Sequence, residues 1–188
     1  MKSNIIKSIR ITLLLTVILC VIYPIAISVA GKLSKGQGNG ETITLNGKVV
    51  GYANIGQSFT KPQYFWGRPS AVGYNAAGSA GSNKGPSNPD YLKDVNSRID
   101  TLLKYHPYLK RSDIPAEMVT ASGSGLDPDI SPAAAKIQIE RVAKVRGLDA
   151  EQVTILVNQH TEQPLFGLFG PAKVNVLKLN VALDELKK

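Results

Sequence analysis

A long, mostly hydrophobic run lies near the start of the chain. Positions 11–31 hold no charged residue, and Arg10 and Lys32 stand on either side of them. A helix rises about 1.5 Å per residue, so this run spans about 30 Å, one hydrocarbon thickness of a bilayer. Pro24 weakens a helix but is tolerated in membranes, where neighbouring groups satisfy the freed backbone. The pattern predicts a transmembrane helix over residues 11–31.

A secretory signal peptide is the alternative interpretation of this run. Residues 28–30, Ser-Val-Ala, resemble a small-x-small cleavage site, and a basic leader precedes the run. The run is longer than the apolar core of a signal peptide, which is about 7–15 residues. We therefore expect an uncleaved anchor.

The next segment predicts a tether and then a β-hairpin. Residues 32–40 are polar and rich in Gly, which is typical of a flexible connection. "TITL" alternates, Asn46-Gly47 suits the two positive-φ positions of a type I′ turn, and "KVVGYANI" returns. We expect antiparallel strands near residues 42–45 and 48–55.

Two helices are predicted by a cap followed by a proline. Asn88 with Pro89 begins the first, whose apolar positions recur at helical spacing and which ends before Pro107. Ser131 with Pro132 begins the second, and Gly147 ends it. Between them, residues 118–121 ("MVTA") indicate a short buried strand. The apolar positions are Leu92, Val95, Ile99, Leu102 and Leu103 in the first helix, and Ala135, Ile139, Val142 and Ala143 in the second.

The C-terminal third predicts further helix. Asp149 and Gln152 resemble a capping box for a helix that runs to about Gln159, with Val153, Leu156 and Val157 facing inward. The last run, "VNVLKLNVALDEL", fits either a helix or an alternating strand. Its length and the terminal Lys187 and Lys188 favour a helix. The predicted fold class is α+β, with one N-terminal transmembrane helix followed by a single exported domain, residues 41–188, that contains a β-hairpin and three to four helices.

Charge sets the expected orientation of the membrane helix. Residues 1–10 contain three basic and no acidic side chains, and all 14 acidic residues of the chain lie beyond position 31. The positive-inside rule therefore places residues 1–10 in the cytoplasm and residues 31–188 outside. The single Cys20 lies within the span, so the exported part has no thiol, which suits an oxidising compartment. The modest positive excess beyond the span gives no reason to expect nucleic-acid binding.

Residues 64–89 combine a linker-like composition with aromatic side chains. The stretch is rich in Gly, Ser and Asn, yet it opens with Tyr64, Phe65 and Trp66. We expect these aromatic side chains to enter the core or a partner's surface and so to order the loop despite its entropy. Arg68 is expected to stack on the Trp66 indole or to pair with a carboxylate. Arg68, Asn83 and Asn88 are the residues expected to pin the loop.

Ser122, Gly123, Ser124 and Gly125 are the strongest candidates for chemistry in the exported part. A hydrolase elbow requires G-x-S-x-G, and position 122 is Ser instead of Gly. Only His106 and His160 could serve as the base. The same run could alternatively form an anion-holding nest of N–H groups.

The remaining motifs give weaker signals. His106 and His160 are isolated and Asp127 and Asp129 resemble turn carboxylates, so no metal site is expected. Residues 164–171 ("PLFGLFGP") place two Phe and two Leu in a Gly-punctuated loop. This loop either caps the core or forms an apolar patch that meets the membrane or a partner.

Several long strings of the sequence resemble one known family. "QSFTKPQYFWGRPSAVGYN", "SAGSNKGPSNP", "VTASGSGLDPDISPAAAKIQIERVAKVRGL" and "VNVLKLNVALD" are similar, in this order, to the C subunit of the Kdp-type potassium-transporting P-type ATPase. The resemblance covers nearly the whole chain. The chain departs from it at Tyr52, Glu117, Met118 and Asp129; the last stands where the family often has His, so a base or ligand there is not expected.

The resemblance implies a non-catalytic accessory subunit of an ATP-driven, high-affinity potassium importer in the bacterial inner (plasma) membrane. Its implied partners are a channel-like potassium-translocating subunit, a P-type ATPase catalytic subunit, a small membrane peptide subunit and the lipid bilayer. Part of the 64–89 loop is then expected to dock on the channel-like subunit. Ala26 and Ala30, small residues four apart, indicate a helix contact within the bilayer.

The resemblance also implies a role in ATP use. The family's C subunit is described as stabilising assembly and as a catalytic chaperone that raises the ATP affinity of the pump subunit, so ATP is a ligand of the complex. An exported domain cannot touch cytoplasmic ATP, and any coupling to it has to be conformational. A membrane-anchored ligand-binding domain or a serine hydrolase is the alternative that the residues alone leave open.

Overall fold

A computed structural model describes residues 2–186, so Lys187 and Lys188, whose charge favoured a C-terminal helix, lie outside the described residues. The chain divides into two compact units, residues 1–42 and 43–188. Each unit is described by itself.

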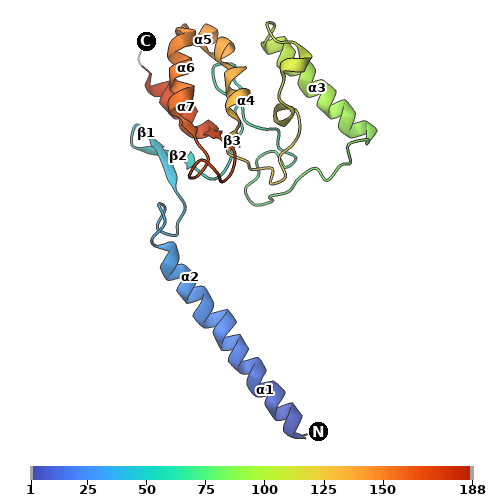
Figure 1. Cartoon of the computed structure of the whole chain (residues 1–188), viewed down its shortest axis with the longest axis vertical. Helices are drawn as coiled ribbons and strands as arrows, with labels where there is room; N and C mark the ends of the chain where they lie inside the picture. Colours follow the sequence, from blue (N-terminus) through green and yellow to red (C-terminus); the bar gives the residue numbers. More distant parts are fainter. Residues whose placement is uncertain (1, 187–188) are drawn as a thin grey trace. The chain divides into compact units, whose positions relative to one another are not determined.

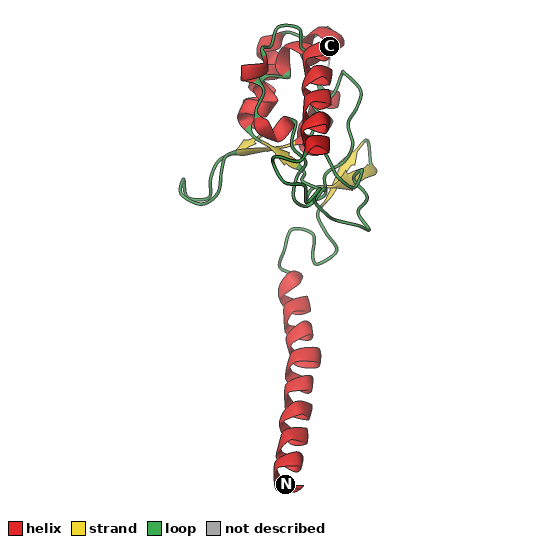
Figure 2. Cartoon of the chain, turned by 90° about the vertical axis from the view of Figure 1, so that its right-hand side faces the viewer, coloured by secondary structure: helices red, strands yellow, loops and turns green. Residues whose placement is uncertain are grey.

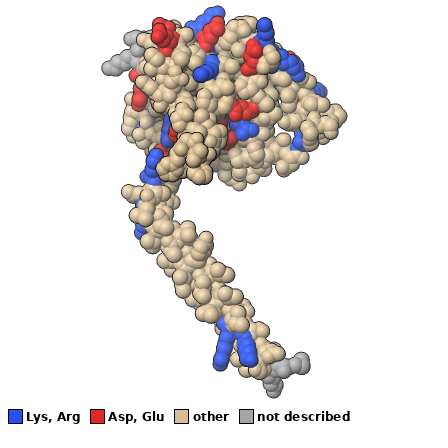
Figure 3. Space-filling model, viewed as in Figure 1, with Lys and Arg blue, Asp and Glu red and all other residues tan. Residues whose placement is uncertain are grey.

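The N-terminal unit contains a single continuous helical rod, blue in Figure 1. It consists of α1 (Lys2–Val17), a π-helical turn η1 (Ile18–Ile22) and α2 (Tyr23–Gly31). Within it, Ser3–Gly31 is a 29-residue helix that is long and apolar enough to cross a membrane, and none of its most apolar window is buried against other residues. Figure 3 shows basic side chains near the start of the rod and an uncharged surface along its middle.

The π-helical turn lies where Pro24 disturbs the backbone. Pro24 has no N–H, and its ring would clash with the carbonyl of residue 20, four positions earlier. That residue, Cys20, lies inside η1, and a single widened turn of this kind relieves such a clash. Ala26 and Ala30 follow on α2, where both are exposed.

The second unit begins with the predicted hairpin, β1 (Thr42–Leu45) and β2 (Lys48–Tyr52). Asn46 and Gly47 have φ values of 51° and 75°, as a type I′ turn requires. The prediction that the second strand continues to residue 55 is wrong. The chain turns after Tyr52, and the Gly56 N–H donates to the Leu126 carbonyl at 2.8 Å.

The remaining strands form a small antiparallel sheet with the order β3-β5-β4. The central strand β5 pairs Val174 with Ile130 on one side and with Thr161 on the other. The short strands that form it are β3 (Asp129–Ile130), β4 (Thr161–Glu162) and β5 (Lys173–Asn175).

Five α-helices of the second unit enclose the core (Figures 1 and 2). The predicted caps are confirmed: Asn88, Ser131 and Asp149 each accept a backbone N–H, and Gly147 ends a helix at φ 65°. Asp149 accepts from the Glu151 N–H, and the predicted capping box with Gln152 is not formed. The C-terminal run is helical from Val176, as favoured, and its first two residues belong to β5. The helices are α3 (Pro89–Tyr105), α4 (Pro132–Lys136), α5 (Ile139–Arg146), α6 (Ala150–Gln159) and α7 (Val176–Glu185).

Two predicted elements differ from the structure. Residues 118–121 are not a strand: Met118 ends the 3₁₀-helix η3 (Ala116–Met118), and the Thr120 N–H bonds back to the Ala116 carbonyl. The helix predicted from Pro132 to Gly147 is interrupted between α4 and α5. Gln138 lies in this interruption, where its side chain binds the Ala134 carbonyl at 3.1 Å.

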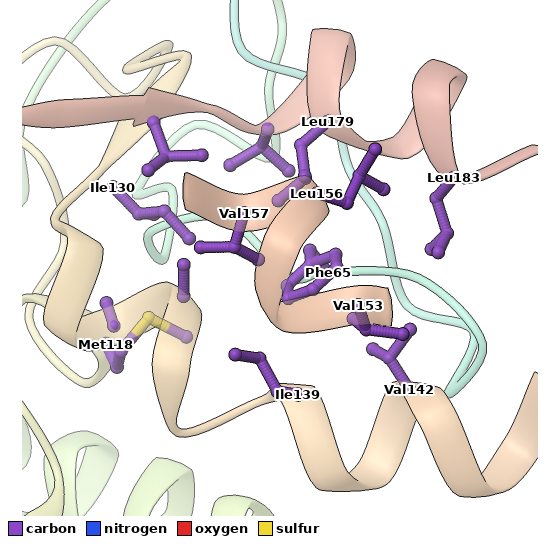
Figure 4. Close-up of a cluster of buried hydrophobic side chains, with 14 of the residues drawn as sticks. Phe65, Met118, Ile130, Ile139, Val142, Val153, Leu156, Val157, Leu179 and Leu183 are labelled. Carbon is purple, nitrogen blue, oxygen red and sulfur yellow. The ribbon is translucent and has the colours of Figure 1, made fainter. Parts of the chain in front are cut away.

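The apolar core lies between the helices and the sheet (Figure 4). Val142 and Val153 come from α5 and α6, and Leu179 and Leu183 come from α7; all four are fully buried. Phe65 lies in their midst although it belongs to no helix or strand, and it too is fully buried. The fold class is therefore α+β, as predicted, and the aromatic segment enters the core.

Candidate functional site

The segment of residues 61–68, here called the braced segment, carries the aromatic side chains that open the Gly/Ser/Asn-rich loop. It pairs with no strand, so its backbone groups need partners from side chains. The carbonyls of residues 62–66 all accept hydrogen bonds from side chains of Asn180, Gln138, Arg141 and Arg146. A long loop is thereby fixed at its start by the helical core.

Two buried carboxamides hold consecutive residues of the braced segment. Asn180 of α7 accepts from the Phe65 N–H at 2.8 Å and donates to the Phe65 carbonyl at 3.0 Å. Gln138 accepts from the Trp66 N–H at 2.8 Å and donates to the Trp66 carbonyl at 3.1 Å. Both carboxamides mimic a neighbouring strand. The segment therefore gains strand-like pairing without a sheet.

Arg141 is the most connected side chain of the site and is 4% exposed. It donates to the carbonyls of Pro62 and Tyr64 and, at 2.7 Å, to the Gln138 carboxamide oxygen. Its guanidinium carbon lies 4.2 Å from the centroid of the Trp66 ring, within the range of a cation–π contact. Burial lowers the pKa of Arg141 to about 10, so the side chain stays charged at neutral pH.

His106 completes this buried network in its neutral form. Its Nε2 atom accepts from the Arg141 Nε–H at 2.8 Å, and its Nδ1 atom lies 2.8 Å from the Leu102 carbonyl, to which it donates. Burial is the main cause that lowers the pKa of His106 to about 4, and the charge of Arg141 lowers it further. His106 is therefore a structural acceptor at neutral pH.

Tyr64 is held at the edge of the site by an ion pair. The Arg146 Nη2 atom lies 2.6 Å from Asp184 Oδ1, and the Tyr64 hydroxyl donates to Asp184 Oδ2 at 3.1 Å. The Arg146 guanidinium also lies over the Tyr64 ring, 4.9 Å from its centroid. Burial and the Asp184 carboxylate raise the pKa of Tyr64.

The chain beyond Trp66 is fixed to the turn that precedes β3. Arg68 pairs with Asp127 at 2.9 Å, and the Tyr74 hydroxyl donates to the Arg68 carbonyl. Ser70 donates to the Gly125 carbonyl at 2.7 Å. Arg68 thus pairs with a carboxylate, one of the two roles considered for it, while the Trp66 ring is covered by Arg141 instead.

The predicted pinning residues lie at different parts of the loop. Tyr64, Phe65 and Trp66 converge on the core, and Arg68 follows them directly. Asn88 lies at the far end of the loop, where it caps α3 through the Tyr91 N–H at 3.1 Å. Asn83 is exposed, with a φ of 52°. Residues 75–80 and 82–87 are all exposed, and this stretch is the free surface of the loop.

The run Ser122–Gly123–Ser124–Gly125 is occupied by contacts within the domain. The N–H of Ser122 donates to Pro69, that of Gly125 to Ser122, and the Ser124 hydroxyl accepts from Leu126. Both nitrogens of His106 are engaged elsewhere, so it does not pair with either serine. Within residues 2–186, no cluster of three or more His, Cys, Asp or Glu side chains could hold a metal ion.

Sequence reasoning missed Gln138, Arg141 and Asn180, the main partners of the braced segment. Gln138 and Arg141 are three residues apart and lie beside the apolar positions Ala135 and Val142. Asn180 lies among the leucines of the last helix. Polar side chains at inward-facing positions of an amphipathic helix were the available signal, because such groups are buried only with partners.

The loop of residues 164–171 is exposed in the domain, so the interpretation that it caps the core is wrong. Its four large apolar side chains have high exposed fractions. These are 63% for Leu165, 83% for Phe166, 80% for Leu168 and 65% for Phe169. The loop joins β4 to β5 and is the long connection that projects from the small sheet in Figure 2.

Fold and site together define a class of protein: an α+β domain that follows one candidate membrane-spanning helix and uses its polar interior to brace a long loop. The family model that matches residues 5–185 is described as "KdpC: K+-transporting ATPase, c chain". The chain belongs to this family, the KdpC subunits of the potassium-transporting ATPase. It is accordingly a membrane-associated accessory subunit in potassium transport.

Curated relatives of the same family align with this chain over almost the whole length of each sequence. One from Bacteroides fragilis (strain YCH46) is 57% identical over 188 residues, covering 98% of each chain. One from Flavobacterium johnsoniae is 60% identical over 185 residues, covering 98% of this chain and 100% of the relative. Another, from Caldanaerobacter subterraneus subsp. tengcongensis, is 48% identical over 190 residues. All three are named potassium-transporting ATPase KdpC subunit.

Proposed function

We propose that this chain is the non-catalytic subunit that stabilises assembly of an ATP-driven potassium importer from the outer side of the membrane. Its partners in this proposal are the channel-like subunit, the P-type ATPase subunit and a small membrane peptide. The braced segment carries the proposal. Seven hydrogen bonds from four side chains of the core hold the start of one loop, and most of the rest of that loop is exposed.

Such an arrangement suits recognition better than catalysis. Loops held by a rigid scaffold are common binding elements, and ordering the loop in advance lowers the entropy lost when a partner binds. The buried Arg141 and His106 are saturated by internal contacts, which leaves them no capacity for a substrate. The exposed residues 75–87 are the part proposed to dock on the channel-like subunit.

The orientation proposed here rests on charge. Lys2, Lys7 and Arg10 precede the candidate span without any acidic residue, which favours a cytoplasmic N-terminus. The domain would then lie on the opposite side from ATP. A contribution to the ATP affinity of the pump subunit is therefore proposed to act through the membrane helix or the channel-like subunit, as a coupling between conformations.

Arg68→Ala tests the docking role of the loop. The change removes the 2.9 Å pair with Asp127 and loosens the chain between the braced segment and the exposed stretch. A partly buried pair of this kind contributes about 1 kcal/mol, so recovery of the partner subunits with a tagged chain should fall by up to roughly fivefold. The measurement is the amount of channel-like and ATPase subunits that co-purify in mild detergent.

Arg111→Ala is the matched control for this experiment. Arg111 donates to the Asn96 side chain at 2.6 Å, but both residues are exposed and lie outside the loop of residues 64–89. This variant should retain partner recovery. If Arg68→Ala and the unchanged chain recover equal amounts of the partner subunits, the Arg68–Asp127 pair has no role in docking. If the unchanged chain recovers no ATPase subunit, the proposed function is wrong.

A further inference from the structure

The loop of residues 164–171, here called the apolar loop, is not used by the braced segment or by its contacts. Leu165, Phe166, Leu168 and Phe169 expose on the order of 500 Å² of apolar surface together, which is at the upper end for one patch on a monomer. The side chains of residues 165–169 contain no polar atom. Patches of this size on soluble surfaces mark contacts with a membrane or another protein.

The backbone of the apolar loop is ordered by its own hydrogen bonds. Leu165 and Phe169 exchange two bonds of 3.0 Å, and Gly167 and Leu168 donate to the carbonyls of Pro164 and Leu165 at 2.8 and 3.1 Å. The N–H groups at the tip are thus largely satisfied within the loop. Hydrocarbon tolerates a backbone only in this condition, because it offers no hydrogen-bond partner.

Phe166 lies in the turn of the apolar loop, at a position with a positive φ that bulky residues rarely adopt. Phe166 and Gly167 have φ values of 54° and 73°, which are those of a type I′ turn. The first of these positions favours Asn, Asp or Gly; the β1–β2 hairpin has Asn46 there and the turn of residues 36–39 has Gln37, both at φ 51°. A bulky residue at positive φ is an outlier that local structure does not explain. Its ring is directed outward, where it is 83% exposed.

The base of the apolar loop is charged. Lys173 binds Asp129 at 2.8 Å and approaches Glu162 at 3.7 Å, so one basic side chain faces two acidic ones. Between Glu162 and Lys173 there is no other charged residue. An apolar tip above a polar, charged base matches the change from hydrocarbon to headgroup across a bilayer surface, where inserted elements reach about 5–10 Å deep.

The apolar loop lies within reach of the bilayer through the connectivity of the chain. Its base is close to the start of the domain, because Asn175 of β5 donates to the Ala53 carbonyl at 2.7 Å, just after β2. Only residues 32–41 separate that hairpin from the candidate span, and a fully extended chain of this length covers at most about 36 Å. The length of this connection therefore limits how far the domain can lie from the bilayer.

From these observations we infer that the apolar loop inserts Phe166 and Leu168 into the surface of the bilayer in which the chain is anchored. The occupant is lipid instead of a protein partner because the tip offers only hydrocarbon. Phe is common in protein interfaces too, but the residues that dominate binding energy there are Trp, Tyr and Arg, with Leu under-represented, and the tip has none of these three. Insertion gives the domain a second membrane contact besides its helix and fixes its distance from the bilayer.

Site-directed spin labelling of the full chain in lipid nanodiscs tests the inference. Cys20 is the only cysteine, so Cys20→Ser provides a thiol-free background to which Leu168→Cys is added. A nitroxide at position 168 should collide several-fold more with oxygen, which partitions into lipid, than with a water-soluble nickel chelate. Ser82→Cys, on the exposed loop of the same domain, is the matched control and should show the opposite preference. The fluorescence of Trp66 verifies that each variant is folded.

Two outcomes would overturn the inference. The first is a label at position 168 that is as accessible to the nickel chelate as the label at position 82. The second is a label that is aqueous in nanodiscs holding this chain alone and becomes shielded only after the complex is assembled. The second result would assign the apolar loop to a protein partner. Neither outcome affects the co-purification test, so the inference and the proposed function fail independently.

Discussion

At the scale of single residues, the buried pair of Arg141 and His106 sets the chemistry of the domain interior. Arg141 has all its contacts within the chain, and His106 supplies one of them through a neutral ring nitrogen. A charged residue can be buried when it is fully hydrogen-bonded, and loss of one partner leaves an uncompensated charge. Protonation of His106 would therefore place two positive charges side by side.

This pair makes the stability of the domain depend on pH. The pKa of His106 falls from about 6.5 in the unfolded chain to about 4 in the folded domain. Between these values the unfolded chain binds a proton that the folded one does not. The contribution of neutral His106 to the free energy of unfolding is thus complete above pH 6.5. As the pH falls toward 4, up to about 3 kcal/mol of this free energy is lost.

Comparison with His106→Gln measures this contribution. Denaturant unfolding of the full chain in detergent, followed by Trp66 fluorescence, should give a stability that falls more steeply from pH 6.5 to 4 in the unchanged protein than in the variant. Carboxylates titrate in both proteins and cancel in the comparison. Identical slopes would show that His106 is not held neutral by folding.

The roles of single residues could be predicted from the sequence only where the interaction partner lies close by in the chain. The caps Asn88, Ser131 and Asp149 act on the helices that they precede, so the local sequence was sufficient. Arg68 was expected to find either the adjacent Trp66 or a carboxylate, and its partner is Asp127, 59 residues away. Local chemistry restricts the type of partner but does not identify it.

At the scale of elements, the braced segment shows how an extended chain is stabilised without a sheet. Asn180 and Gln138 provide to Phe65 and Trp66 what a neighbouring strand would provide, and Phe65 adds a fully buried side chain. The aromatic residues predicted that the segment would be ordered. The donors could not be predicted, because they lie 72 and 115 residues further along the chain, in the turn between α4 and α5 and in α7.

Replacing Gln138 should detach the braced segment. In Gln138→Leu, the N–H and carbonyl of Trp66 and one Arg141 donor lose their partner in a buried site. Each unsatisfied group costs about 1–3 kcal/mol, so the free energy of unfolding should decrease by roughly 3–5 kcal/mol. The emission of Trp66, the single tryptophan, should shift to longer wavelength as the indole is hydrated.

Gln152→Leu is the matched control, since Gln152 is exposed on α6. This variant should change stability by less than about 0.5 kcal/mol and leave the Trp66 emission unchanged. If the Gln138→Leu protein has the same stability and Trp66 emission as the control, the Gln138 side chain does not hold the braced segment.

At the scale of the whole chain, the two units differ in where their apolar surface lies. The helix Ser3–Gly31 has an apolar surface that the rest of the chain does not bury, whereas the second unit has its own apolar core. Composition and periodicity were sufficient to predict this division and the α+β class. The strand order β3-β5-β4 was not predictable, because strands of two or three residues leave no alternating pattern to detect.

Cysteine labelling in intact cells tests the orientation of the chain. In the Cys20→Ser background, Ser82→Cys should react with a membrane-impermeant maleimide, because the positive-inside rule places the domain outside. Asn4→Cys, on the other side of the span, should react only after the membrane is permeabilised. The reverse pattern would place the domain in the cytoplasm and would allow it direct access to nucleotide.

The partners of the braced segment have a consequence for biosynthesis. Asn180 and Asp184 are contributed by α7, which the ribosome makes long after the braced segment, since Phe65 and Asn180 are 115 residues apart. A nascent chain lacking α7 has the Phe65 and Tyr64 contacts only in part, and its long loop stays unfastened. Closure of such distant contacts is slow compared with formation of a single helix. The loop therefore acquires its fixed shape only after α7 has been made, so products terminated before α7 would not present an ordered loop to the other subunits.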